Sequence, residues 1–313
     1  MKRSTNVVPD SDSRRILITG ASGQVGGELL HTLAPLGEIV APTRSELNLS
    51  DSASIQACIR GVRPRWIVNA GAYTAVDKAE SEPDLAFAIN AEAVRTIGLE
   101  ALALGAAVLH FSTDYVFSGQ SPQPYTETDP TGPLNVYGAS KLAGEQALRE
   151  TGAAALIFRT SWVYGATGKN FLRTILKLAR ERDNLSIVAD QHGAPTWSRD
   201  LGGLAAHVIA HCERSAAETS VAEATSRFAG IYHASGSGET TWAGFATEAI
   251  RQLHEREPAA KFATVTPIST ADYPTPAARP KNSLMSSEKL FQVFSWRMMD
   301  WQESLAQVLA ELA

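Results

Sequence analysis

The sequence predicts an α/β fold: a doubly wound parallel sheet with a smaller C-terminal lobe. Short apolar runs alternate along the chain with segments of helical periodicity. Strands joined through helices run parallel, and right-handed crossovers place helices on both faces of the sheet. Strands buried on both faces are apolar along their length, as these runs are. The strands are expected at residues 15–19, 38–41, 65–69, 107–111 and 155–159, and the helices at 24–34, 52–61, 83–104 and 136–150.

Later parts of the chain follow this pattern less regularly. Residues 185–188 and 230–233 are expected to form two further strands. After residue 235, short helices are expected between proline-rich connections such as residues 273–276. This change of pattern predicts a second, smaller lobe.

The chain is accordingly divided into a sheet domain and a lobe. The sheet domain comprises residues 15–165 and a returning segment, 198–233. The lobe comprises residues 166–197 and 234–313. Residues 1–14 are rich in Ser, Asp, Arg and Pro and lack the apolar centre of a signal peptide, so they are expected to form a disordered extension.

Composition and charge favour a globular chain that binds small molecules. Of the 313 residues, 44% are hydrophobic and 19% charged, and the formal net charge is -5. A nucleic-acid-binding domain would show a basic patch or stripe, so no nucleic acid is expected. No apolar run approaches the roughly eighteen residues of a membrane span, so no membrane is expected either. The two cysteines, Cys58 and Cys212, lack the spacing of a disulfide or zinc framework, which fits a cytoplasmic protein.

The first strand runs directly into a glycine-rich turn and a helix. Gly20, Gly23 and Gly26 are separated by two residues each. Glycine is needed where a turn is tight, where backbone approaches a pyrophosphate and where helix meets strand, and the helix N-terminus supplies amide donors. The three glycines therefore predict a dinucleotide site. A simple strand-to-helix turn is the alternative.

The end of the second strand bears on the choice of cofactor. NAD-preferring enzymes carry an acid there for the ribose hydroxyls, whereas this chain has Arg44. A guanidinium suits phosphate oxygens, so NADPH is favoured, although the nearby Glu46 leaves NADH open. The alternative for Arg44 is a solvated surface residue. Asn48 and Leu49 are expected to line the adenine pocket.

A tyrosine and a lysine form the candidate proton donor. Tyr137 and Lys141 fall at i and i+4 on the expected helix, so the ammonium can lie beside the phenol. Free tyrosine has a pKa of about 10, and a neighbouring cation lowers it toward the range that general acid catalysis requires. Thr113, at the carboxyl end of the fourth strand, has a hydroxyl that can orient a carbonyl substrate. The alternative is that Thr113 only satisfies loop backbone groups.

These segments resemble those of the extended short-chain dehydrogenases, and within them the dTDP-4-dehydrorhamnose reductases. The resemblance implies a Rossmann fold whose sheet domain binds the dinucleotide and whose lobe binds substrate. It also implies reduction of the C4 ketone of dTDP-4-dehydro-L-rhamnose to dTDP-L-rhamnose, which supplies activated sugar for cell-surface polysaccharide. The matching segments are residues 19–26, 68–82, 112–119, 137–141, 159–164, 190–196 and 279–283.

The resemblance also assigns roles to individual positions of the cofactor and catalytic site. Tyr137 would be the proton donor, Lys141 would tune it and hold the nicotinamide ribose, and Thr113 would adjust the pair. The dinucleotide would lie against small residues after the third strand, where a tight strand end is the alternative. The positions implied to contact the cofactor are Gly23, Gln24, Val25, Ala72, Tyr73, Thr74, Tyr137 and Lys141.

Three further residues are implied to face the sugar nucleotide. Asp114 would contact it directly, and the indole of Trp162 offers an apolar platform for a pyranose, a buried core tryptophan being the alternative. Arg279 would bind the diphosphate through two hydrogen bonds or, as the alternative, form a structural ion pair. The resemblance also brings in Mg²⁺ and a homodimer. No compact carboxylate cluster predicts an octahedral site, so no metal ligand is assigned.

Two competing interpretations stay open at this point. The first is another nucleotide-sugar reductase or epimerase of the same family. Dehydratases usually carry an acid pair after the fourth-strand threonine, whereas here Thr113 precedes Asp114 and Tyr115, which favours simple reduction. The second is a non-enzymatic NADP-binding regulatory subunit resembling that of methionine adenosyltransferase. Retention of Thr113, Tyr137 and Lys141 argues against it.

Overall fold

A six-stranded, wholly parallel sheet forms the centre of the protein, whose computed structural model describes residues 14–216 and 219–312. The predicted extension, residues 1–14, lies outside this range except for its last residue. The strand order is β10-β5-β4-β3-β1-β2, which confirms the predicted doubly wound sheet. The strands are β1 (Arg15–Thr19), β2 (Glu38–Val40), β3 (Trp66–Asn69), β4 (Ala107–Thr113), β5 (Ala155–Thr160) and β10 (Gly230–His233).

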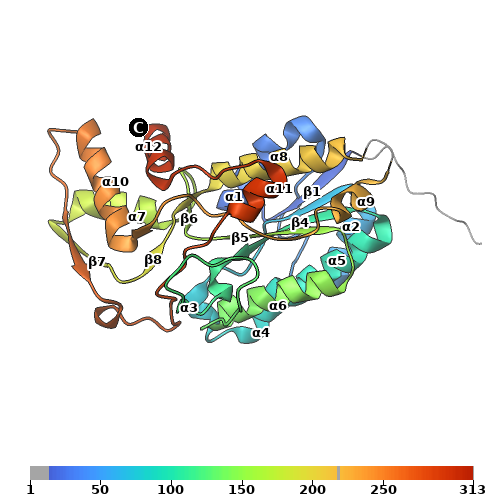
Figure 1. The fold of residues 1–313 in the computed structure, drawn as a ribbon, viewed down its shortest axis with the longest axis horizontal. Helices are drawn as coiled ribbons and strands as arrows, with labels where there is room; N and C mark the ends of the chain where they lie inside the picture. The colour runs from blue at the N-terminus through green and yellow to red at the C-terminus, as the bar shows by residue number, and fades with distance from the viewer. Residues whose placement is uncertain (1–13, 217–218, 313) are drawn as a thin grey trace, which may run out of the picture.

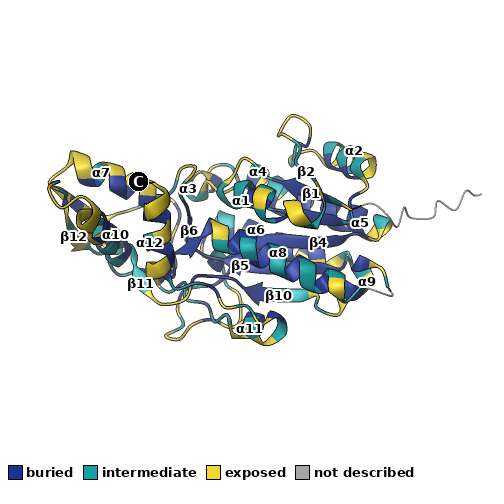
Figure 2. Cartoon of the chain, turned by 90° about the horizontal axis from the view of Figure 1, so that it is seen from above, coloured by how far each residue is buried: buried dark blue, intermediate teal, exposed yellow. Residues whose placement is uncertain are grey.

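Helices cover both faces of the sheet (Figure 1). One face carries α1 (Gln24–Thr32), α8 (Ser198–Arg214) and α11 (Glu288–Phe294), and the other carries α2 (Ser52–Val62), α5 (Ala93–Leu104) and α6 (Val136–Glu150). Successive strand residues enter opposite cores, as the two-residue period of a strand requires. Ile18 packs on the α1 side and Leu17 on the α2 side. Figure 2 shows the resulting buried sheet between half-exposed helices.

The helix predicted over residues 83–104 is interrupted in its middle. It consists of α4 (Pro83–Phe87), a π-helical turn η2 (Ala88–Glu92) and α5. A π-helical turn widens the helix by one residue and often marks a functional position. Here it carries Asn90, which is only 1% exposed.

The lobe at the far end of the molecule contains three helices and three small sheets (Figure 1). The expectation of only short helices after residue 235 is wrong, because α10 is 15 residues long. Phe245, Ala249 and Leu253 repeat at a four-residue spacing on α10 and pack in one apolar cluster. The lobe elements are α7 (Phe171–Glu181), α10 (Trp242–Arg256), α12 (Trp301–Glu311), and the pairs β6 (Val163–Tyr164) with β9 (Thr196–Trp197), β7 (Asn184–Val188) with β12 (Thr264–Ile268), and β8 (His192–Gly193) with β11 (Thr240–Thr241).

The short elements complete the described chain. Leu290 and Phe294 of α11 pack in the apolar cluster of the six-stranded sheet, although the predicted division assigns them to the lobe. The division itself stays a prediction.

No helix of residues 14–216 and 219–312 combines the length and apolar character needed to cross a membrane. The remaining elements are η1 (Ala34–Leu36), α3 (Val76–Ala79), η3 (Asp114–Val116), α9 (Val221–Ser226) and η4 (Thr270–Asp272).

Candidate active site

The candidate residues gather at one edge of the central sheet. Parallel strands β1, β3, β4 and β5 all end at this edge. The chain passes from β1 to β2 on one side and continues with β3 on the other side of β1, so the strand order reverses here. Ligands of open α/β sheets bind in the crevice at such a reversal. The candidate residues nearest the strand ends are Gly20, Ala72, Thr113 and Trp162.

The glycine turn has the backbone geometry that its spacing predicts. Gly20 has a φ of 69°, and a Cβ added there would lie 2.6 Å from the backbone of Gly71. A Cβ added at Gly26 would lie 2.0 Å from the carbonyl oxygen of Gly20. Gly23 precedes α1 with no side-chain cap, and the first turn of α1 contains no acid. The helix N-terminus therefore leaves its amide donors and positive dipole end for an anion, as a pyrophosphate requires.

Gln24 and Val25 at the start of α1 face protein rather than open space. The Gln24 amide donates to the Val163 carbonyl oxygen at 3.3 Å and accepts from Asn170 at 2.9 Å. Val25 packs against the apolar cluster around β1. Contact of these residues with a pyrophosphate would therefore come from the backbone at the helix start.

The segment after β2 is exposed and internally hydrogen-bonded. Arg44 is exposed, and no described residue forms a hydrogen bond or ion pair with its guanidinium. Glu46 instead accepts from the backbone and hydroxyl of Thr43, and these bonds lower the pKa of its carboxyl. Asn48 accepts from Ser50 at 3.1 Å and 2.9 Å, which folds the segment back on itself. Arg44 is thus the side chain of this segment left to meet a ligand.

Leu49 connects this segment to the glycine turn. A Cβ added at Gly71 would lie 2.6 Å from Leu49 Cδ1. The leucine side chain therefore packs against Gly71, next to the point where the backbones of Gly20 and Gly71 meet. It also packs against the core on the α2 side.

The segment after β3 is fixed by a residue that sequence reasoning missed. Asn90 accepts from the Tyr73 N–H at 2.9 Å, donates to the Tyr73 carbonyl oxygen at 3.0 Å and donates to Ser140 at 3.0 Å. The Tyr73 side chain turns to Glu82, 2.7 Å away. Ala72 and Tyr73 are half-buried and Thr74 is exposed. The π-helical turn thus ties the predicted cofactor-flanking backbone to α6.

The proton-donor cluster lies between the end of β4 and the start of α6. Asn135 caps α6 by accepting from the Gly138 N–H at 2.8 Å. Thr113 accepts from the Tyr115 N–H at 3.2 Å and donates to Asp114 at 2.9 Å. The ring of Tyr137 packs edge-on against Tyr115, with centroids 5.6 Å apart. These contacts bring Thr113, Asp114 and Tyr137 together as predicted.

Burial shifts the pKa values of both Tyr137 and Lys141 in this cluster. Burial raises the pKa of Tyr137 to about 12, hydrogen bonding by Thr113 lowers it, and the charge of Asp114 raises it. Burial also lowers the pKa of Lys141 to about 8, against the opposing effect of Glu145. The Lys141 ammonium donates to the Phe111 carbonyl oxygen at 2.6 Å. Burial therefore dominates the pKa of Tyr137 in this structure, and the Lys141 ammonium is directed at the strand. The lowering of the Tyr137 pKa by Lys141 stays a prediction.

A buried ion pair beneath the cluster was also missed from the sequence. Arg159 of β5 donates twice to Glu145 of α6, at 2.9 Å and 2.7 Å, and both residues are at most 2% exposed. The Ser112 hydroxyl donates to the same carboxylate at 2.5 Å. Breaking such a buried pair by removing one partner is strongly destabilising. The pair fixes α6 against the two strands that carry the site.

Asp114 is the most buried of the predicted substrate residues, at 2% exposure. Burial raises the pKa of its carboxyl to about 6, while hydrogen bonds from Ser283 and Thr113 act in the opposite direction. Ser283 belongs to the late segment that resembles the reductases. The structure thus brings this segment to the end of β4.

Trp162 is held in an unusual conformation beside a second tryptophan. Its φ of 47° lies in the left-handed region, which bulky residues rarely adopt. Its ring stacks on Trp242 with centroids 3.6 Å apart and 10° between the planes. Gly193 also lies against this ring, since an added Cβ would be 2.6 Å from Trp162 Cε2. Trp242, which sequence reasoning missed, therefore covers ring surface that was predicted to serve as a sugar platform.

Arg279 adopts the arrangement given as its alternative. It forms two hydrogen bonds with Asp77, at 2.5 Å and 2.8 Å, and donates to the Ala277 carbonyl oxygen. These bonds raise the pKa of Arg279 and lower that of Asp77. Asn135 adds a 2.7 Å bond to the Ala278 carbonyl oxygen. The ion pair thus fastens the late segment to α3, and the Asn135 bond fastens it to the start of α6.

No metal site coincides with these residues among those that the structure describes. In the part of the chain that the structure describes, no group of three or more His, Cys, Asp or Glu side chains is placed to hold a metal. The described side chains thus do not fit the Mg²⁺ site that the resemblance implies.

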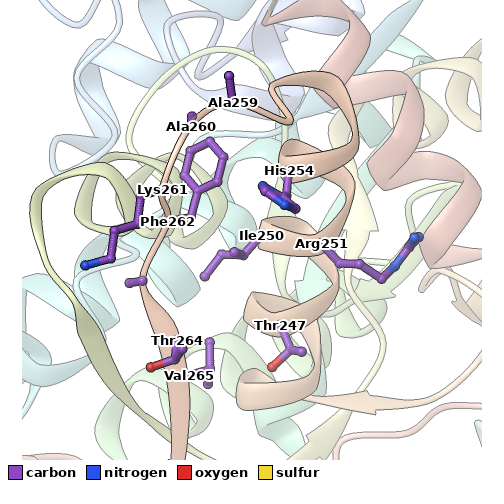
Figure 3. A pocket seen from close by; sticks show the side chains of 11 residues that line it. Thr247, Ile250, Arg251, His254, Ala259, Ala260, Lys261, Phe262, Thr264 and Val265 are labelled. Atoms are coloured by element: carbon purple, nitrogen blue, oxygen red, sulfur yellow. The ribbon is translucent and has the colours of Figure 1, made fainter.

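A pocket between α10 and β12 is lined by residues including Ile250, His254 and Phe262 (Figure 3). None of the predicted site residues lines that pocket.

Comparisons with known proteins show which proteins the chain resembles. The model of the RmlD substrate binding domain family matches residues 14–313. The dTDP-4-dehydrorhamnose reductase of Burkholderia thailandensis is 44% identical over 300 residues, covering 95% of this chain and 99% of the relative. That of Escherichia coli K12 is 44% identical over 301 residues, covering 95% and 97%.

A solved structure extends the likeness to three dimensions. It is the dTDP-4-dehydrorhamnose reductase of Bacillus anthracis in complex with NADP. The two chains are 36% identical, with a TM-score of 0.83, and the match covers 96% of this chain and 99% of the other. The likeness therefore includes both the central sheet and the lobe.

Proposed function

The chain belongs to the dTDP-4-dehydrorhamnose reductase family, and on this basis we propose that it reduces the C4 ketone of dTDP-4-dehydro-L-rhamnose to dTDP-L-rhamnose. The observation that carries the proposal is the meeting of Thr113, Tyr137 and Lys141 at the sheet edge where the glycine turn also lies. The product would serve as an activated sugar for cell-surface polysaccharide. We further propose that the protein assembles as a homodimer and acts in the cytoplasm.

A reduced nicotinamide dinucleotide fits the residues of the turn. Gly20 and Gly26 allow a close backbone approach that a Cβ would prevent, and α1 offers uncapped amide donors. We propose NADPH as the preferred form, with Arg44 meeting the 2'-phosphate, since its guanidinium is exposed and unpaired among the described residues. The Bacillus anthracis relative was solved with NADP. When bound, the cofactor supplies the hydride.

The protein's part in the reaction is to deliver a proton. As hydride reaches C4, the two electrons of the carbonyl π bond move to oxygen, and the Tyr137 hydroxyl gives that oxygen its proton. We propose that the Thr113 hydroxyl, which hydrogen-bonds the Tyr137 phenol, also orients the substrate oxygen. The Lys141 charge stabilises the phenolate that remains, which offsets the effect of burial on Tyr137.

Substrate recognition is proposed for Asp114, Trp162 and the residues packed on them. Asp114 offers a carboxyl buried at the end of β4. Trp162 presents the edge of a stacked indole pair, whose N–H can donate to a sugar hydroxyl. Arg279 is proposed to act through Asp77, by holding the late segment against α3.

Oxidation of NADPH with and without the sugar nucleotide tests this function. We expect oxidation that depends on dTDP-4-dehydro-L-rhamnose and is faster than with other 4-keto nucleotide sugars. Faster turnover of another nucleotide sugar would favour the first competing interpretation. Tight NADPH binding without substrate-dependent oxidation would contradict the proposal and favour the regulatory subunit.

A further inference from the structure

A row of buried polar residues crosses the sheet beneath the candidate site. Thr19 of β1, Asn69 of β3 and His110 of β4 occupy paired positions in the strand register. Their exposures are 1%, 2% and 0%, and Lys141 at the end of the row is 2% exposed. The atoms are joined at 2.5 Å from Thr19 to Asn69, 2.9 Å from Asn69 to His110 and 3.4 Å from His110 to Lys141. The row thus leads from the glycine turn to the proposed catalytic lysine.

The backbone fixes the direction of the first hydrogen bonds. The N–H of Gly71 donates to the Thr19 hydroxyl oxygen at 3.0 Å. The Thr19 hydroxyl then donates its own hydrogen to Asn69 Oδ1. With its oxygen engaged in this way, Asn69 presents its NH₂ group to Nδ1 of His110. The opposite orientation of Asn69 would leave the buried Thr19 hydroxyl hydrogen without this acceptor, which costs free energy.

This direction determines which nitrogen of His110 carries the proton. Burial and the charge of Lys141 lower the pKa of His110 well below its usual range, so the ring is neutral. A neutral imidazole that accepts at Nδ1 carries its hydrogen at Nε2. The Nε2 atom lies 3.4 Å from Lys141 Nζ. The histidine therefore turns an N–H, not a lone pair, toward the lysine.

An N–H facing the lysine favours the neutral amine over the ammonium. A neutral amine accepts this hydrogen with its lone pair, whereas an ammonium has only donors. The carbonyl oxygen of Phe111 favours the charged form from the other side. Glu145 of α6 acts to raise the pKa of Lys141 and is itself bound by Arg159 of β5, and Tyr137 lies one turn before Lys141 on the same helix.

From this geometry we propose that His110 is a positioning residue that turns its Nε2 hydrogen toward Lys141 and so weakens the hold of the lysine on its proton. Thr19 and Asn69 act through His110 by fixing its tautomer. The inference rests on the proposed function, in which the Lys141 charge assists Tyr137. It adds a means by which residues of β1 and β3, remote from the substrate, adjust that charge.

Two variants of Thr19 test the proposal without touching Lys141. Thr19→Val removes the hydroxyl that orients Asn69, and Thr19→Ser is the matched control that keeps it. The kcat/KM for the sugar nucleotide is measured from about pH 6 to about pH 10, because this ratio reports the free enzyme. The wild type is expected to lose activity as pH rises through the Lys141 pKa of about 8.

In Thr19→Val the fall in activity should move to higher pH by about half to one pH unit, the size expected for one hydrogen bond. His110→Asn, which lacks a hydrogen at the Nε2 position, should shift it in the same direction. Thr19→Ser should retain the wild-type profile. A role in packing alone would lower activity without moving the profile. Unchanged profiles in both Thr19→Val and His110→Asn would overturn the proposal.

A measurement that needs no activity separates this inference from the proposed function. Two-bond ¹H–¹⁵N spectra of the histidine-labelled protein distinguish the two imidazole tautomers, and loss of a signal in His110→Asn assigns it. We expect the Nε2–H form for His110 in the wild type and in Thr19→Ser. The Nδ1–H form, or a charged ring near neutral pH, would refute the inference even in an active enzyme. The Nε2–H form would support it even if no substrate is reduced.

Discussion

The glycine turn and the proton-donor cluster lie at the same sheet edge but depend on opposite features of the chain. In the turn, Gly20 and Gly26 matter because they lack side chains, and the binding groups are backbone amides at the start of α1. In the cluster, Tyr137 and Lys141 matter through their side chains, whose pKa values burial has shifted. A backbone site is therefore specified by spacing, whereas a side-chain site is specified by its surroundings.

This difference leads to separate consequences for substitution. Changes in the turn should affect stability and cofactor affinity, because they alter the shape of the backbone. Changes in the cluster should affect turnover or its pH dependence, because they alter proton transfer. A substitution that affected both properties equally would break the distinction.

The largest effect is expected from Tyr137→Phe. Removal of the proton donor should lower kcat by about 10²- to 10⁴-fold, the usual contribution of general acid catalysis. The ring and its edge-on contact with Tyr115 stay in place. Steady-state oxidation of NADPH with the sugar nucleotide measures the effect, and Tyr115→Phe is the matched control at a neighbouring ring. Turnover equal to wild type would remove Tyr137 from the mechanism.

Gly26→Ala should damage the turn without acting on proton transfer. Its Cβ would lie 2.0 Å from the Gly20 carbonyl oxygen, so the backbone must shift. We expect the free energy of unfolding to fall by at least about 2 kcal/mol, as measured by denaturant titration. Gly61→Ala in α2 is the control, because nothing lies within 4 Å of its added Cβ. A Gly26→Ala protein as stable as Gly61→Ala would show that the turn is not closely packed.

Asp114 provides a pH test of the cluster. Its pKa is raised from 3.8 to about 6 in the folded protein, so folding favours the protonated carboxyl. Its stabilising contribution is fully present below about pH 4 and is lost as pH rises through about 6, at a cost of about 2 to 3 kcal/mol. Comparison of the unfolding free energies of wild type and Asp114→Asn across this range measures it. An equal pH dependence in both proteins would contradict the burial effect.

The smallest effect is expected from Arg44→Ala, at the exposed rim of the cofactor site. Loss of one solvent-exposed charge should weaken NADPH binding by at most about fivefold, since such interactions are screened by water. NADH binding should stay nearly unchanged, because it lacks the 2'-phosphate. Titration of the variant and wild type with both cofactors measures the ratio. Equal losses for the two cofactors would exclude the 2'-phosphate role of Arg44. Cofactor binding would then be attributed to the glycine turn alone.

The sequence predicted those parts of the protein that depend on local pattern. Apolar runs located the six strands of the sheet, and the spacing of Gly20, Gly23 and Gly26 located the turn. The spacing of Tyr137 and Lys141 located the donor helix, but not the electrostatics around it. Desolvation depends on every element packed around a group, so the raised pKa of Tyr137 required the folded structure.

Other features depend on contacts between distant segments. Asn90 sits in a π-helical turn that looks like ordinary helix in the sequence, and Trp242 meets Trp162 from 80 positions away along the chain. A sequence signal did exist for the buried row. Thr19, Asn69 and His110 are polar residues in otherwise apolar strands, which require partners when buried. Only the strand register shows that these three residues are partners of one another.

The dissociation constant of NADPH from Tyr137→Phe tests most directly whether binding and proton transfer belong to separate regions. Fluorescence titration of the variant should give a value within about twofold of wild type, although its turnover is lost. A loss of NADPH affinity by more than about tenfold would place Tyr137 in cofactor binding and contradict the separation.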